Sequence, residues 1–176
     1  MTALKAGLLP LYIKLYDDID PAWRKPLEGF VEKIGDRLRR LGLELDVAPV
    51  CRVESEFRSA VRAMEKRQPD AMITLHLAYS PSLESAGVLA ETPLDIVVLD
   101  TTPDYAFGPD TTPDLIMNNH GIHGVQDMCN LLIRRGKTFS IEAGHWQRSD
   151  VLQRVVDQVR ASRLAKALRN ARVGLI

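Results

Sequence analysis

Cysteine is scarce in this chain, and neither acidic nor basic residues are in excess. Only two cysteines, Cys51 and Cys129, occur among the 176 residues, too few for the disulfide scaffold of a small secreted protein. The 23 lysine and arginine residues are balanced by 23 aspartate and glutamate residues, so there is no basic excess to form a nucleic-acid surface. The scarcity of cysteine favours a reduced, cytoplasmic compartment, and the charge balance favours a partner other than nucleic acid.

Long apolar runs and targeting signals are missing as well. The N-terminal segment MTALKAGLLPLYIKLYDD is apolar, but it lacks a basic leader and a small-residue cleavage site. We therefore interpret this segment as a strand rather than a signal peptide. No apolar stretch is long enough to span a bilayer, so we expect no membrane partner.

The glycine patterns that bind phosphate are absent after the first expected strand. The segment LLPLYIKLYDD contains neither GxGxxG nor the lysine-containing loop of a P-loop protein. Since these patterns bring backbone N–H groups to a phosphate, their absence argues against a nicotinamide- or nucleotide-binding domain.

Apolar segments that favour strands alternate with amphipathic segments along the chain. The expected strands are Lys5–Ile13, Leu43–Val50, Ala71–Ala78, Asp95–Asp100 and Thr138–Ala143. Apolar residues three and four positions apart mark the helices between them. The second strand alternates apolar and polar residues, which is typical of an edge, whereas the first, third and fourth strands are nearly all apolar. The pattern predicts an α/β fold with an open, doubly wound parallel sheet in three layers and the flavodoxin-like order 2-1-3-4-5.

The region between the last two expected strands begins with a loop and continues as a helix. Residues 101–117 contain three prolines, and a loop of this length in a compact domain is usually functional or disordered. Asn118 or Asn119 is expected to cap the helix that follows. The apolar residues expected to face the core from this helix are Ile122, Val125, Cys129, Leu132 and Ile133.

The length predicts one α/β domain over residues 1–171. The final residues, RVGLI, are similar to AGLL near the start of the first strand. We therefore expect residues 172–176 to begin a strand that leads into a further domain, so that this chain is the N-terminal part of a longer protein.

Polar and aromatic residues follow the expected strands at their carboxyl ends, where open parallel sheets bind ligands. They are Lys14 and Tyr16 after the first strand, His76 and Ser80 at the end of the third, His120 and His123 at the start of the fourth helix, and His145 and Trp146 after the fifth strand. All four histidines are thus expected at one edge of the sheet, which we interpret as functional. The alternatives are polar residues that merely populate loops and, for Trp146, a packing role in place of stacking on a sugar.

The two histidines at the helix start allow more than one role. His120 and His123 share a helical face, with Asp127 one turn further on. A histidine pair with a carboxylate is compatible with part of a metal site, but no third ligand is evident, and capping or backbone hydrogen bonding is favoured. Histidines at a helix N-terminus also suit a hydroxylated ligand, and Gly121 and Gly124 would allow the backbone to approach closely.

Neither cysteine is a strong candidate for catalysis. Cys51 follows the second strand and could act as a nucleophile, although a single cysteine at a strand end is more typical of packing. Cys129 lies on the apolar stripe of its helix and is expected in the core.

Four stretches of the sequence resemble one enzyme family. They are NNHGIHGVQDMCNLLIRRGK, IEAGHW, TLHLAYSPS and VVLDTTPDY. Together they are similar to the N-terminal region of the L-fucose and L-arabinose isomerase family, and the resemblance spans most of the chain. The HG-containing helix start and the GHW after the fifth strand are its most specific parts.

The resemblance implies a cytoplasmic, oligomeric ketol isomerase that interconverts an aldose and a ketose through an enediol, with a divalent metal, typically manganese. In that family the metal-binding carboxylates and histidine lie in later domains, so the resemblance implies no catalytic or metal-binding residue in this chain. The N-terminal domain helps to close the sugar site, often that of a neighbouring subunit.

The resemblance also implies substrate contacts, with His123 matching the histidine of the HG motif. The substrate-binding residues that we expect are His123, His120, His76, Lys14, Tyr16, Ser80 and Trp146. Arabinose isomerases have a glutamine-containing segment after the first strand and a different run around Asp100, so these residues do not identify the sugar.

Three functions are compatible with the sequence. The first is the N-terminal substrate-pocket and oligomerisation domain of such an isomerase, inactive alone. The second is a stand-alone flavodoxin-like module that binds a sugar without catalysis. The third is a small complete enzyme in which His120, His123 and Asp127 hold a metal. The sequence lacks a carboxylate pair at metal-binding spacing, and this favours the first function.

Overall fold

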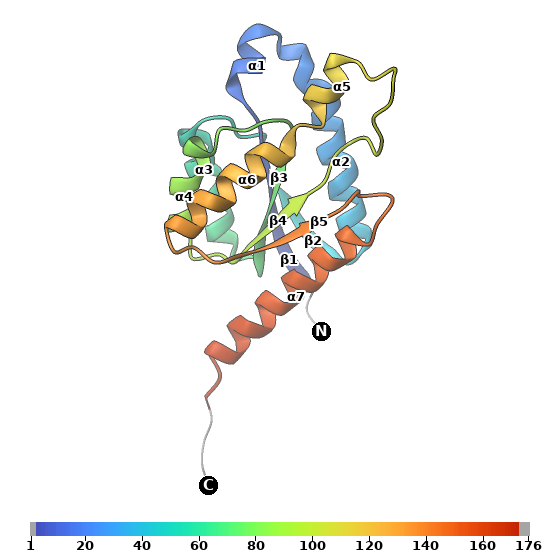
Figure 1. The fold of residues 1–176 in the computed structure, drawn as a ribbon. Coiled ribbons are helices and arrows are strands. Elements are labelled where there is room, and N and C mark those ends of the chain that lie inside the picture. Colours follow the sequence, from blue (N-terminus) through green and yellow to red (C-terminus); the bar gives the residue numbers. More distant parts are fainter. Residues whose placement is uncertain (1–2, 173–176) are drawn as a thin grey trace.

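The computed structural model describes residues 3–172, which form a parallel five-stranded sheet with helices on both faces (Figure 1). The strands are β1 (Leu4–Leu11), β2 (Leu43–Val47), β3 (Ala71–His76), β4 (Ile96–Asp100) and β5 (Phe139–Ala143). Their order is β2-β1-β3-β4-β5, so the predicted fold class and strand order are confirmed. The alternating strand β2 lies at an edge, as its pattern predicted.

The helices cover the two faces of the sheet unequally. They are α1 (Lys14–Ile19), the 3₁₀ helix η1 (Pro21–Arg24), α2 (Lys25–Arg40), α3 (Glu54–Arg67), α4 (Ser82–Glu91), α5 (Pro113–Asn118), α6 (Gly121–Arg134) and α7 (Val151–Arg169). Helices α2 and α7 pack on one face, and α3, α4 and α6 on the other. Helices α1 and α5 lie beyond the carboxyl ends of the strands (Figure 1).

The core has two halves because successive strand residues point to opposite faces. Leu8 packs with α2 and α7, whereas Leu9 packs with α3, α4 and α6. Burying a leucine side chain stabilises a fold by about 1.5–3 kcal/mol. The nearly continuous apolar runs of the three inner strands are explained by this two-sided burial.

Three short helices, α1, η1 and α5, lie outside the regular helices that the sequence pattern predicted. Helix α1 follows β1 directly, and η1 begins after Asp20, whose carboxylate accepts a hydrogen bond from the Ala22 N–H at 2.9 Å. Helix α5 lies inside the expected loop of residues 101–117, with Thr112 as its N-cap and Pro113 at its first position. A capping threonine followed by proline is a helix-start signal, and it shortens the loop to residues 101–112.

The prediction that Ile122 and Ile133 face the core is wrong. Their side chains are 38% and 68% exposed, whereas Val125, Cys129 and Leu132 are buried as expected. The physical reason is that α6 packs against β3 and β4, so the flank of α6 that faces the β5 edge has no strand beneath it. Helical periodicity identifies an apolar stripe but not how much of its width is covered.

No helix within residues 3–172 is both long and apolar enough to cross a membrane. The expectation that residues 172–176 begin a new strand falls mainly on 173–176, which lie outside the described residues.

Candidate functional site

The predicted site residues lie around the carboxyl-end edge of the sheet but divide into separate groups. His76 is the last residue of β3, His120 is the N-cap residue of α6, and His145 follows β5 by two residues. His123 belongs to the first turn of α6. The histidines therefore come to this edge from three different segments, and their surroundings differ.

His76 is buried beneath the first turn of α6. Its exposure is 2%, and neither ring nitrogen has a hydrogen-bond partner among the described residues. Burial lowers the pKa of His76 to about 3, so the ring is neutral at pH 7. The contact of His76 with substrate stays a prediction, and it would require α6 to move.

Gly121 and Gly124 are the residues that let α6 approach β3 so closely. A Cβ atom on Gly121 would lie 2.8 Å from the His76 carbonyl oxygen. One on Gly124 would lie 2.6 Å from His76 Cδ2 and 3.1 Å from the Ser80 backbone. The close approach expected of these glycines is thus made to His76 and Ser80. Ser80 itself is buried, and its hydroxyl donates to the Tyr12 carbonyl at 3.5 Å.

His120 and His123 form a pair on the surface above this buried region. Their ring centroids are 4.2 Å apart, and the His120 ring also contacts Tyr79 edge-on at 6.3 Å. The Tyr79 hydroxyl donates to Asp127 at 3.3 Å. The pair is therefore accessible and is flanked by a phenol and a carboxylate, groups that can exchange hydrogen bonds with a hydroxylated molecule.

Tyr16 lines an aromatic cavity at the carboxyl end of β1. Tyr16 contacts Tyr12 and Trp23 edge-on, with ring centroids 6.0 Å apart in both cases. The cavity has a volume of about 160 Å³. Its lining comes from the end of β1, from α1 and η1, from the start of α2, and from α5: Tyr12, Tyr16, Ala22, Trp23, Pro26, Asp114, Met117 and Asn118. Burial raises the pKa of Tyr12 to about 12, so its phenol keeps its proton.

The junction of α5 and α6 joins the aromatic cavity to the histidine pair and is fixed by Asn119. The Asn119 amide donates to Asp104 Oδ2 at 3.0 Å and to the Leu115 carbonyl at 2.7 Å, and its Oδ1 accepts from the Asp104 N–H at 2.9 Å. Asn119 had been considered as a helix cap. It instead ties the loop of residues 101–112 to α5, because its buried amide finds its partners there.

Trp146 and Lys14 lie apart from both groups. The Trp146 indole N–H donates to the Pro103 carbonyl at 3.3 Å, and its ring packs edge-on against Phe30. This satisfies the polar atom of Trp146 within the fold. Lys14 is exposed, and its ammonium group donates to both Asp18 carboxylate oxygens at 2.5 and 2.7 Å. Sugar contacts by these two residues stay predictions.

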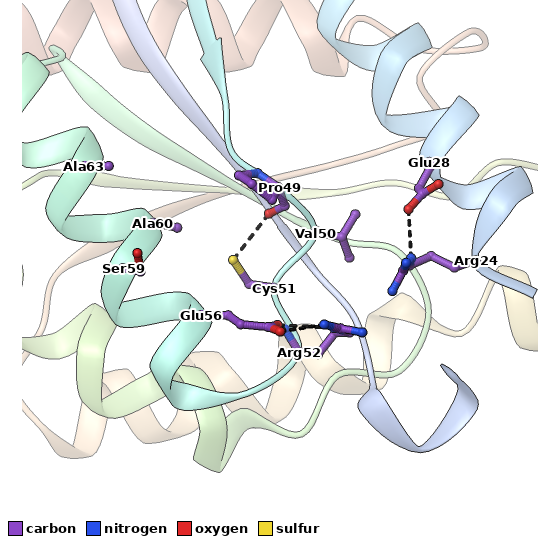
Figure 2. Close-up of a pocket in the computed structure, with 10 residues that line it drawn as sticks. All are labelled: Arg24, Glu28, Pro49, Val50, Cys51, Arg52, Glu56, Ser59, Ala60 and Ala63. Atoms are coloured by element: carbon purple, nitrogen blue, oxygen red, sulfur yellow. Dashed lines mark hydrogen bonds and ion pairs between the residues drawn. The ribbon is translucent and has the colours of Figure 1, made fainter. Parts of the chain in front are cut away.

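A larger cavity of about 670 Å³ opens at the end of β2 (Figure 2). Its lining combines small and apolar residues with two acid–base pairs: Arg24, Glu28, Pro49, Val50, Cys51, Arg52, Glu56, Ser59, Ala60 and Ala63. Figure 2 shows Arg52 paired with Glu56 and Arg24 with Glu28. Hydrogen bonds from Arg52 lower the pKa of Glu56, so these charges neutralise each other within the fold.

Asp17 and Cys51 lie at this cavity. Asp17 is in ion pairs with two arginines, and Cys51 is a buried thiol. The side chain of Asp17, 8% exposed, accepts hydrogen bonds from both Arg24 and Arg52. Burial and the nearby Glu56 raise the pKa of the Cys51 thiol to about 12. A nucleophilic cysteine must be a thiolate, so the protonated Cys51 is suited to packing, the role that its position at a strand end favoured.

Sequence reasoning missed Tyr12, Asp114 and Asn118 as cavity residues. Tyr12 was counted within the first strand, and Asp114 and Asn118 lay in the segment expected to be a loop or a helix start. The spacing of Tyr12, Tyr16 and Trp23 was the one signal available, but it gives contact only because a short helix turns the chain back after β1.

No three His, Cys, Asp or Glu side chains in the described part of the chain are grouped so that they could hold a metal ion. No protein-family model matches this chain, and a search of curated proteins found no match.

Proposed function

We propose that this chain is the substrate-pocket domain of a metal-dependent aldose–ketose isomerase of the L-fucose or L-arabinose type. Its role is to bind one face of the sugar at the carboxyl-end edge of the sheet. A cytoplasmic location is part of the proposal, and the two free, buried cysteines are compatible with it.

The aromatic cavity is the observation that carries this proposal. It lies over the end of β1, next to the point where the strand order reverses between β1 and β3. This is the place where open α/β sheets bind ligands. A volume of about 160 Å³ is small, and it favours a small molecule such as a monosaccharide over a dinucleotide.

The chemistry of the lining suits a sugar. Tyr16 and Trp23 offer aromatic surface to the apolar C–H groups of a sugar ring. Asp114 and Asn118 supply a carboxylate acceptor and an amide with both donor and acceptor atoms, and these exchange hydrogen bonds with hydroxyl groups. His120 follows Asn118 by two residues and His123 follows it by five, so the polar lining of the cavity is followed directly in the sequence by the histidine pair.

The sequence stretches that resemble the isomerase family contribute to this same edge. The HG-containing stretch supplies the start of α6, TLHLAYSPS the end of β3, and IEAGHW the end of β5. A family resemblance that coincides with the predicted ligand edge supports the isomerase proposal over a role unrelated to sugars.

The manganese of such an enzyme does not fit the residues of this chain. Mn²⁺ prefers carboxylate and other oxygen ligands, and His120 and His123 are not part of any group of three His, Cys, Asp or Glu side chains within residues 3–172 that could hold a metal ion. We therefore assign no reaction step to a metal here. The chain's own residues bind and orient the sugar.

A titration with matched variants tests the proposal. L-Fucose and L-arabinose are titrated into the chain while the combined fluorescence of Trp23 and Trp146 is followed, and Asp114→Asn is compared with Asp110→Asn. Both aspartates are exposed, but only Asp114 lines the cavity. Because a hydrogen bond to a charged group contributes about 1.5–3 kcal/mol, D114N should weaken binding about tenfold or more and D110N should not. Equal affinities, or no saturable signal for either sugar, would contradict the proposal.

A stand-alone sugar-binding module would use the same cavity, so this titration does not separate it from the isomerase domain. The two functions differ in the His123→Ala variant of the complete protein. If the domain serves an isomerase, that change should lower turnover without unfolding the protein. A protein with no isomerase turnover even before the change would favour the stand-alone module.

A further inference from the structure

Of the features that keep an edge strand from pairing, β5 has a short length and one inward-pointing charge but no outward-pointing charge and no proline. β5 bonds to β4 on one side, and no strand of residues 3–172 pairs with its other side. Its sequence, FSIEA, contains no lysine or proline, the residues that commonly protect edges. Its one charged residue, Glu142, points to the α7 face, where it pairs with Arg154 at 2.7 Å and accepts from Gln158 at 3.0 Å.

The other face of β5 is apolar and only partly covered. The register with β4 turns Phe139, Ile141 and Ala143 to the side of the sheet that carries α6. Phe139 packs against the core on this side, whereas Ile141 and Ala143 are exposed, because α6 packs mainly over β3 and β4. Ile141 is 48% exposed, and Ile133 on the adjacent flank of α6 is 68% exposed. We call Phe139–Ala143 together with Ile122 and Ile133 the β5 edge surface.

We infer that the β5 edge surface joins two copies of this chain through antiparallel pairing of their β5 strands about a two-fold axis at Ile141. This inference is independent of the proposed sugar site. It rests on three properties of the surface: the direction of the free backbone groups, the match of the side chains across the axis, and the contrast with β2.

The backbone of β5 presents its free groups at the positions that such pairing needs. The Gly144 N–H donates to the Asp100 carbonyl at 3.0 Å. Since the backbone groups of alternate residues point to opposite sides of a strand, Ser140 and Glu142 bond toward β4. The N–H and C=O groups of Phe139, Ile141 and Ala143 face outward. With the axis at Ile141, the two copies of Ile141 exchange both hydrogen bonds, and Phe139 exchanges them with the partner's Ala143.

The side chains opposite each other across this axis are complementary. The large Phe139 faces the partner's small Ala143, and Ile141 faces the partner's Ile141. On the α7 face, Ser140 faces the partner's Glu142, so a hydroxyl donor meets a carboxylate acceptor. An axis normal to the sheet also sets both α6 helices on the same face, one on each side of the paired strands, so that Ile122 and Ile133 of each copy flank the apolar strip formed by the two β5 strands. A two-fold interface requires such self-complementarity.

The opposite edge strand, β2, is poorly suited to the same pairing. The same pairing of β2 about its central residue, Leu45, would set Glu44 directly opposite the partner's Asp46. Like charges directly opposite each other destabilise strand pairing. The charges thus favour a second copy at β5 and disfavour one at β2.

The oligomeric state of the full chain tests the inference. Light scattering after gel filtration, over a range of concentrations, should give a dimer. Ile141→Lys and, independently, Ile133→Glu should each raise the dimer dissociation constant at least about tenfold. Leu83→Lys is the matched control, because Leu83 is 81% exposed on α4, away from β5, and it should leave the dimer intact. A chain that stays monomeric, or a dimer unaffected by I141K and I133E, would overturn the inference.

A cross-link tests the position of the axis. In a hydrogen-bonded antiparallel pair the Cα atoms are about 5.5 Å apart, within disulfide range. Ile141→Cys should therefore give a covalent dimer on mild oxidation. The native cysteines are buried, with exposures of 2% and 7%, and Leu83→Cys controls for random collision. Equal cross-linking of I141C and L83C would contradict an axis at Ile141.

Discussion

Gly124 lies so close to His76 that a Cβ atom at position 124 would be 2.6 Å from the imidazole Cδ2. The contact joins the first turn of α6 to the last residue of β3. It explains why glycine occupies the start of a helix in which most other residue types would have higher helix propensity.

Replacing Gly124 with alanine should destabilise the fold. The added methyl group meets His76 and the Ser80 backbone, neither of which is the free end of a flexible side chain, and overpacking of this kind costs about 1–3 kcal/mol. Gly87→Ala is the control, since nothing lies within 4 Å of its added Cβ in α4. G87A should stabilise by about 0.5–1 kcal/mol, and urea unfolding measures both. Equal effects would contradict the contact.

Stability should fall with acid in a way that depends on His76. Burial lowers the pKa of His76 from 6.5 to about 3 in the folded chain, so between these values the unfolded chain binds a proton that the folded chain does not. Stability therefore rises with pH across this window, by up to about 1.4 kcal/mol per pH unit. Unfolding measured at pH 7, 6 and 5 should show a smaller loss in His76→Leu than in the native chain.

In the same unfolding measurements at pH 7, 6 and 5, a second variant controls for the removal of a histidine that is not buried. His123→Gln removes an exposed ring and should retain the native pH dependence. If H76L and the native chain lose stability in parallel from pH 7 to pH 5, His76 is protonated in the folded chain and the account of its burial is wrong.

Asp17 should contribute more stability than its neighbour Asp18. Asp17 is 8% exposed and accepts from Arg24 and Arg52, whereas Asp18 pairs with Lys14 at an exposed site. Asp17→Asn leaves two partly buried guanidinium groups without that charge, which should cost about 1.5–3 kcal/mol. Asp18→Asn should change stability by less than about 1 kcal/mol. Thermal unfolding of both variants checks this. If D17N leaves the stability unchanged, the ion pairs of Asp17 with Arg24 and Arg52 contribute nothing to the stability of the fold.

The isolated chain supplied with Mn²⁺ should not interconvert an aldose and a ketose. An enediol mechanism needs a metal to polarise adjacent oxygens and a base to move a proton, and the described residues form no group of three His, Cys, Asp or Glu side chains that could hold the metal. Product analysis by chromatography measures this. Conversion that depends on His123 would instead support a complete small enzyme.

The sheet was predictable because its signals are local. The apolar runs of β1, β3 and β4 and the alternation in β2 indicate which strands are covered on both faces, and that is enough to favour one strand order. The exposed positions of Ile122 and Ile133 were not predictable, since they depend on which strands α6 covers.

The site was only partly predictable, for a related reason. The carboxyl-end rule brings His120 and Tyr16 to one edge from sequence order alone. This rule does not say how deeply a side chain is buried, so the burial of His76 under Gly124 was not predicted. The wall formed by Asp114 and Asn118 depends on α5, whose Thr-Pro start signal lay within an expected loop.

The most direct test of the central claim is a map of the sugar site by NMR. Labelled chain is titrated with L-fucose and with L-arabinose, and backbone and indole N–H shifts are followed. We expect saturable shifts for Tyr16, Trp23, Asp114 and Asn118, with little change at the 670 Å³ cavity beside Cys51. Shifts confined to that larger cavity, or no saturable shift with either sugar, would contradict the proposed sugar site.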